Sequence, residues 1–125
     1  MLIIDDDGDS AQALAAALDM EGFRTVVARN GFTAFKTAPA WTPHVVILDI
    51  EMPDCDRFAM ASAMRGSSRF QNTPIIAFTS LAEADVIERG KDAQIDAFCR
   101  KGSSIRPLLK LIEYLAPVSG PSDTI

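Results

Sequence analysis

The chain has 125 residues, of which 48% are hydrophobic and 23% are charged, and its formal net charge is −5. That length suits a single domain with one hydrophobic core. The composition argues against a disordered chain, and no apolar run approaches the roughly 18 residues that a membrane-spanning helix needs. Twelve Lys and Arg residues face 17 Asp and Glu residues without forming a basic stripe, which argues against direct nucleic-acid binding.

The cysteines and the first residues indicate the compartment. Cys55 and Cys99 lie 44 positions apart, a spacing typical of neither a disulfide framework nor a metal knuckle. Acidic residues follow directly after the apolar stretch Met1–Ile4, so no signal peptide is visible. We therefore expect a reducing, cytoplasmic setting and no membrane contact.

Short, continuous apolar runs recur along the chain and predict β-strands. Each run is too short for a helix, and most are rich in β-branched or aromatic residues. Continuous apolar runs are typical of parallel strands that are covered on both faces. The runs are Leu2–Ile4, Thr25–Ala28, Val45–Leu48, Ile75–Phe78 and Ala97–Cys99.

Three helices are predicted in the first half of the chain. Asp9, with Gln12 three residues later, predicts the cap of a first helix that ends at Gly22. A second helix is expected over Phe32–Ala38, where the following proline stops it. A third is expected over Phe58–Arg65, before a glycine.

Two more helices are predicted in the second half. Ser80 and Glu83 form a capping box for a fourth helix. Pro107 stands near the start of a fifth, which carries an apolar stripe. We expect the ordered domain to cover residues 1–117, followed by a tail or truncated linker over 118–125.

Strands that alternate with helices predict an open parallel α/β sheet. We expect a flavodoxin-like (βα)5 three-layer sandwich with five strands in the order 2-1-3-4-5. The chain is too short for a closed eight-stranded barrel. In open sheets of this kind, ligands bind beyond the carboxyl ends of the strands, at the switch point of the strand order.

Polar residues stand at the carboxyl ends of four predicted strands. Clustered carboxylates repel each other unless a proton or a cation lies between them, and hard oxygen ligands suit Mg²⁺. Asp49 as nucleophile, with the Thr79 hydroxyl and the Lys101 ammonium opposite, would suit phosphoryl transfer. The residues are Asp5-Asp6-Asp7 after the first strand, Asp49 after the third, Thr79-Ser80 after the fourth and Arg100-Lys101 after the fifth.

This pattern resembles the receiver domain of bacterial two-component response regulators, over about residues 1 to 116. The matching stretches are Leu2–Asp7, Val46–Pro53, Phe78–Ser80 and Lys101. Each stretch alone is a weak signal. Together, at the ends of successive strands in one short chain, they are highly specific.

The resemblance implies a metal-assisted phosphoacceptor site. Asp49 would accept a phosphoryl group from a histidine kinase or a phosphotransfer protein. Asp5, Asp6 and Asp49 would hold Mg²⁺ together with the backbone carbonyl of Glu51. The protein would assist its own phosphorylation and dephosphorylation without being an enzyme for a metabolite.

The resemblance also implies a switch. Thr79 and Lys101 would each bind a phosphoryl oxygen, and Phe98 would turn inward as Thr79 moves toward the phosphoryl group. The face made by the fourth helix, fifth strand and fifth helix would then change. A downstream effector protein or domain would recognise that face, and a homodimer through the same face is one form of such recognition.

Two positions depart from the family pattern and open a second interpretation. Arg57 stands where the family usually has glycine, and Gly102 stands where it usually has proline after a cis peptide bond. We expect a trans bond at Lys101–Gly102, since a cis bond before a non-proline residue costs about 2.5–4 kcal/mol. The alternative function is a degenerate receiver that binds partners without phosphorylation.

Two enzyme classes also fit parts of the pattern. A phosphatase of the haloacid dehalogenase kind uses an aspartyl nucleophile followed by a second Asp two residues later, where this chain has Glu51. A Rossmann or P-loop nucleotide binder needs a glycine-rich loop, whereas Gly8 is the only glycine near the first strand. Both classes therefore fit less well than a receiver.

Overall fold

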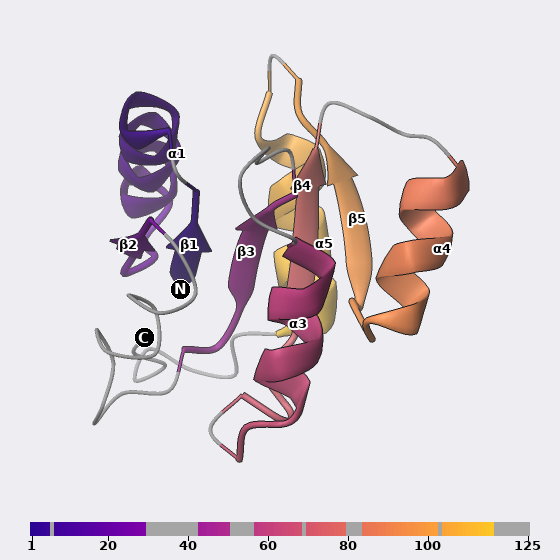
Figure 1. The fold of residues 1–125 in the computed structure, drawn as a ribbon. Helices are drawn as coiled ribbons and strands as arrows, with labels where there is room; N and C mark the ends of the chain where they lie inside the picture. Colours follow the sequence, from indigo (N-terminus) through magenta and orange to yellow (C-terminus); the bar gives the residue numbers. More distant parts are fainter. Residues whose placement is uncertain are drawn as a thin grey trace.

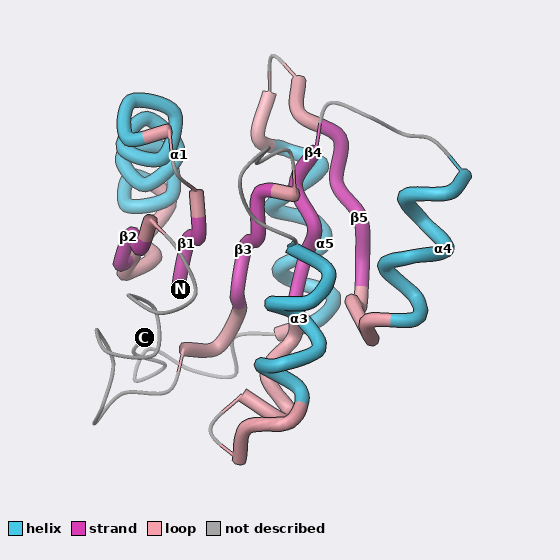
Figure 2. The backbone as a smooth tube through the Cα atoms, viewed as in Figure 1, coloured by secondary structure: helices cyan, strands magenta, loops and turns pink. Residues whose placement is uncertain are grey.

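The computed structural model of the chain describes residues 1–5, 7–29, 43–50, 57–68, 70–79, 84–102 and 104–116. In these ranges a parallel sheet lies between helices (Figure 1). Figure 2 shows the same helices and strands along the backbone tube. The elements are β1 (Leu2–Ile4), α1 (Gly8–Met20), β2 (Val26–Ala28), β3 (Val46–Asp49), α3 (Arg57–Arg65), β4 (Ile75–Thr79), α4 (Ala84–Asp92), β5 (Ala97–Arg100) and α5 (Arg106–Leu115).

The strand order confirms the predicted topology. The sheet has five strands in the order β2-β1-β3-β4-β5, and every neighbouring pair is parallel. β2 is added on one side of β1, and β3, β4 and β5 are added on the other side, so the switch point of the strand order lies between β1 and β3. Because all strands run the same way, their carboxyl ends lie at one edge, and in open sheets of this kind ligands bind at that edge beside the switch point.

The strands are apolar throughout because both faces of the sheet are covered. In β3, Val46 and Leu48 belong to one buried cluster, whereas Ile47 belongs to the other. The first cluster includes residues of α3 and Ala93, which directly follows α4, and the second includes residues of α1 and α5. Figure 1 shows α3 in front of the sheet and α5 behind it. The molecule therefore has the three layers expected from the sequence.

Local boundaries correct several predictions by one or two residues. The side chain of Asp7, not Asp9, caps α1: it accepts a 3.3 Å hydrogen bond from the Ser10 N–H. Asp49 and Thr79 are the last residues of β3 and β4 rather than the first residues after them. Which side chain caps a helix depends on the backbone conformation between β1 and α1, and residue spacing alone does not specify that conformation.

Some predictions fall on residues that the structure does not describe. These are the second helix over Phe32–Ala38, the capping box of Ser80 and Glu83, and the tail over 118–125. Among the described residues, no helix is both long and apolar enough to cross a membrane.

Candidate functional site

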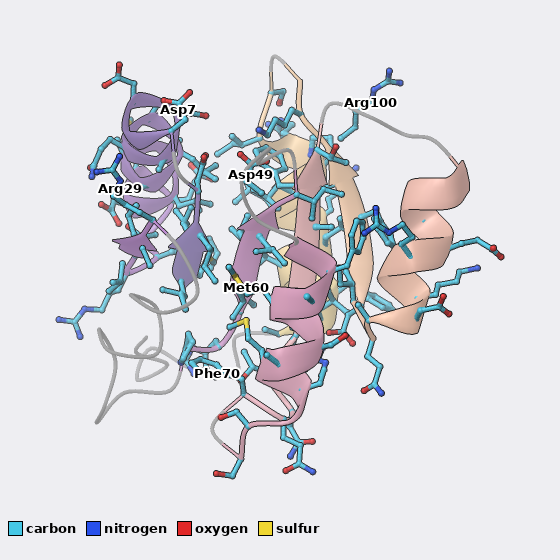
Figure 3. All side chains as sticks on the ribbon, in the orientation of Figure 1. Asp7, Arg29, Asp49, Met60, Phe70 and Arg100 are labelled. Carbon is cyan, nitrogen blue, oxygen red and sulfur yellow. The ribbon has the colours of Figure 1, made fainter. Side chains whose placement is uncertain are left out.

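The site is built from the ends of four strands. Asp5 follows β1, Asp49 ends β3 and Thr79 ends β4, and all three are almost fully buried. Lys101 follows β5, and its backbone N–H donates a 2.7 Å hydrogen bond to the Thr79 carbonyl. Figure 3 shows Asp49 at the carboxyl end of β3. The parallel register thus brings together residues that are far apart in the sequence.

Lys101 and Asp49 form an ion pair at this edge. Lys101 Nζ lies 3.2 Å from Asp49 Oδ2, and the two side chains are 27% and 9% exposed. The ammonium also lies 5.8 Å from the centre of the Phe78 ring, a contact that the sequence did not predict. No cis peptide bond occurs among the described residues, so the trans bond expected at Lys101–Gly102 is confirmed.

Asp5 lies beside Asp49, and the pKa of the Asp5 carboxyl is raised in this position. Burial raises the pKa of the Asp5 carboxyl to about 6, and the hydrogen bond and negative charge of Asp49 contribute to the rise. The Asp7 N–H, which donates a 2.9 Å hydrogen bond to Asp5 Oδ1, and the charge of Lys101 act in the opposite direction. A second positive charge at this place would therefore be stabilised by the acid pair.

The donor set fits a hard divalent cation. Asp5 and Asp49 contribute two adjacent buried carboxyl groups, and buried like charges of this kind need a proton or a cation between them. No group of three or more His, Cys, Asp and Glu side chains converges within the described ranges. The other two predicted ligands, Asp6 and the Glu51 carbonyl, fall outside those ranges.

Thr79 and Phe98 lie on neighbouring strands of the sheet, offset by two residues. Phe98 pairs with Ala77 across β4 and β5, and Thr79 follows two residues later on the same strand. The ring of Phe98 is partly buried and packs against the core cluster on the α3 and α4 side. Arg57 begins α3, but its side chain lies outside what the structure describes.

Comparison with known proteins identifies one family along most of the chain. The family described as "Response regulator receiver domain" matches residues 1–113. The Mycobacterium tuberculosis protein named transcriptional regulatory protein PdtaR is 34% identical over 114 residues, which is 90% of this chain and 54% of that protein. The chain spans between 18% and 54% of the length of the curated relatives that it matches.

Solved structures share the fold. The chemotaxis response regulator CheY4 of Vibrio cholerae has a TM-score of 0.84 and 25% identity, and the match covers 91% of this chain and 95% of CheY4. The Thermotoga maritima response regulator TrrA, solved in complex with Mg²⁺ and BeF, has a TM-score of 0.78 and 26% identity, with 91% and 96% of the two chains covered.

Proposed function

The chain belongs to the response regulator receiver domain family, and we propose that it is a phosphoacceptor receiver in which Asp49 takes the phosphoryl group. The observation that carries this proposal is the ion pair of Asp49 with Lys101 beside the buried Asp5. This family consists of signalling domains of two-component systems. The function proposed for this chain is accordingly signalling by protein contact rather than conversion of a metabolite.

The proposed chemistry is transfer of a phosphoryl group between two proteins. A carboxylate oxygen of Asp49 attacks phosphorus, the P–N bond to a donor phosphohistidine breaks, and the imidazole leaves with a proton from solvent. The product is an acyl phosphate, which water later hydrolyses to the carboxylate and inorganic phosphate. The donor is a histidine kinase or a phosphotransfer protein, and we expect the exchange to occur in the cytoplasm.

The other side chains position and neutralise the phosphoryl group. Lys101, which already contacts Asp49, would pair with one phosphoryl oxygen, and the Thr79 hydroxyl would donate a hydrogen bond to another. Asp5, Asp6, Asp49 and the Glu51 carbonyl would hold Mg²⁺. When bound, the cation neutralises charge on the phosphoryl oxygens. The neighbouring TrrA structure contains Mg²⁺ and BeF, which supports this proposal.

The output of the proposed switch is a change of surface. Movement of Thr79 toward the phosphoryl group would let Phe98 turn inward, because the two lie on neighbouring strands. The surface of α4, β5 and α5 would then change, and a downstream effector or a second copy of the chain would bind it. The covalent anion shifts the balance between two surfaces rather than creating a new fold.

Intact mass after incubation with Mg²⁺ and acetyl phosphate tests the proposal. We expect wild type to gain one phosphoryl group, Asp49→Asn to gain none, and removal of Mg²⁺ with a chelator to reduce the gain strongly. Asp9→Asn is the matched control, since Asp9 is an exposed acid in the first turn of α1. This control should gain the group as wild type does.

A different outcome would support the degenerate receiver. If folded wild-type protein binds Mg²⁺ but never gains mass, Asp49 is not a phosphoacceptor and partner binding is independent of phosphorylation. Phosphorylation that persists in Asp49→Asn would instead place the acceptor at another residue. The departures at Arg57 and Gly102 motivate this second arm.

A further inference from the structure

A glycine in α4 lies against the outer edge of the Phe98 ring. A Cβ atom added at Gly90 would lie 2.1 Å from Phe98 Cζ and 2.6 Å from Cε1. Real Cβ atoms do not approach other heavy atoms so closely, so any side chain at this position would displace the ring or the helix. The backbone of α4 and the Phe98 ring are therefore in direct contact.

This glycine is unfavourable for the helix by itself. Gly90 is buried within α4, where glycine destabilises a helix relative to alanine because it loses more conformational freedom. Nothing about its own backbone requires glycine, since its φ is not in the left-handed region. The contact with the aromatic ring is thus the feature of the structure that accounts for it.

The ring, in turn, is on the same side of the sheet as Thr79. Ala77 belongs to the cluster on the α3 and α4 side, and alternation along β4 places Thr79 on that side too. Phe98 pairs with Ala77 and packs against the same cluster. The space beside Phe98 is therefore bounded by Gly90 on the helix and by β4 on the sheet.

We propose that Gly90 is a positioning residue: its missing side chain provides the seat for the partly buried Phe98 ring, and phosphorylation at Asp49 favours the seated ring. The second half rests on the proposed function, whereas the first half does not. Any side chain at position 90 would keep the ring out of the seat. It would thereby weaken the connection between the acidic site and the surface of α4 and β5.

A double-mutant cycle tests the seat without phosphorylation. Urea unfolding is measured for wild type, Gly90→Ala, Phe98→Ala and the double variant. We expect Gly90→Ala to lower the folding equilibrium constant about tenfold when Phe98 is present, and to raise it when Phe98 is absent, because alanine is then only a better helix former. The same sign in both backgrounds would overturn the proposal.

Gly66→Ala is the matched control. A Cβ at Gly66 would lie 3.5 Å from the Ala63 carbonyl oxygen, which is an ordinary contact. This variant should have the same effect on stability with and without Phe98. Coupling of similar size at position 66 would show that the cycle reports a general response to Phe98→Ala and would overturn the seat.

Affinity for Mg²⁺ and fluoroberyllate tests the regulatory half. We expect Gly90→Ala to bind this phosphoryl mimic about three- to tenfold more weakly than wild type, and to have no further effect in the Phe98→Ala background. Unchanged or tighter binding by Gly90→Ala would overturn the regulatory role. If wild type itself does not bind the mimic, the proposed function and the regulatory half fail together, while the sign reversal in stability still decides the seat.

Discussion

At the amino end of the sheet the charged pair Arg65–Asp96 is surrounded by hydrogen-bond partners, whereas at the carboxyl end two buried carboxyl groups, Asp5 and Asp49, lie beside each other. Arg65 is 11% exposed, and its guanidinium donates to four backbone carbonyls and to the Asp96 carboxylate, which also accepts from the Ile75 N–H. The carbonyls are those of Gln94 at 3.0 Å, Phe70 at 3.2 Å, Gln71 at 3.3 Å and Thr73 at 2.6 Å.

The difference between these two ends separates a structural network from a candidate binding site. Every contact of Arg65 joins a donor to an acceptor, so the network connects the chain before β4 to the chain before β5. At the other end, burial and a neighbouring acid raise the pKa of Asp5, so the folded chain keeps an unfavourable arrangement there. A cation would relieve the second arrangement and would have no comparable role in the first.

The largest expected effect is at the structural end. Arg65→Met keeps the apolar stem but removes the guanidinium that donates to these carbonyls and to Asp96, and we expect it to lower the free energy of unfolding by about 2–4 kcal/mol. Urea unfolding measures this change. Arg106→Met, at an exposed position on α5, should change it by less than about 0.5 kcal/mol. Equal losses for the two variants would show that the network does not stabilise the fold.

Asp5→Asn tests the opposite expectation at the site. The native pKa of about 6 lies above the reference value of 3.8, so between these pH values the folded state binds more protons than the unfolded state. Stability is therefore lost as pH rises from about 4 to 6. Without metal at pH 7.5, we expect Asp5→Asn to be more stable than wild type by about 2–3 kcal/mol.

The pH dependence of that difference is the sharper measurement. Unfolding in the presence of a chelator should show the gain of Asp5→Asn shrinking toward zero near pH 4, where wild-type Asp5 is protonated. A gain that stays constant between pH 4 and 7.5 would exclude ionisation of Asp5 as its cause. Added Mg²⁺ should stabilise wild type and leave Asp5→Asn nearly unchanged.

Lys101→Met should have the smallest effect on folding. Lys101 is partly exposed, so loss of its ion pair with Asp49 should change the free energy of unfolding by less than about 1 kcal/mol. The charge of Lys101 lowers the pKa of Asp5, so in the variant the loss of stability on ionisation of Asp5 should occur at a higher pH. The affinity of the phosphorylated protein for its partner should fall by a larger free energy than the free energy of unfolding does. Equal partner affinity of phosphorylated wild type and phosphorylated variant would contradict this.

Much of the fold could be predicted from the pattern of apolar residues. Runs such as Val45–Leu48 are apolar at every position because helices cover both sides of the sheet, and this marked them as parallel strands. The start of α1 could not be predicted so closely. Asp7 and Asp9 are both competent caps, and only the direction of the chain after β1 determines which side chain reaches the Ser10 N–H.

The chemical types at the site were also predictable, but their energetics were not. The acids, the hydroxyl and the amine stand at strand ends in the sequence, and a parallel sheet must gather such ends at one edge. The raised pKa of Asp5 depends on how completely Asp5 is buried and on its closeness to Asp49. Burial and closeness both depend on how segments far apart in the chain pack together, which the linear order of residues does not specify.

The sequence by itself determined the alternation of strands and helices and the polar residues that stand at the strand ends, because periodicity and chain direction are local properties. The tertiary structure alone decided which polar groups are satisfied. No sequence pattern distinguishes Arg65 or Gly90. In the fold, Arg65 is the centre of a hydrogen-bond network and Gly90 contacts an aromatic ring. Such roles come from neighbours that are distant in the chain, so only the folded arrangement reveals them.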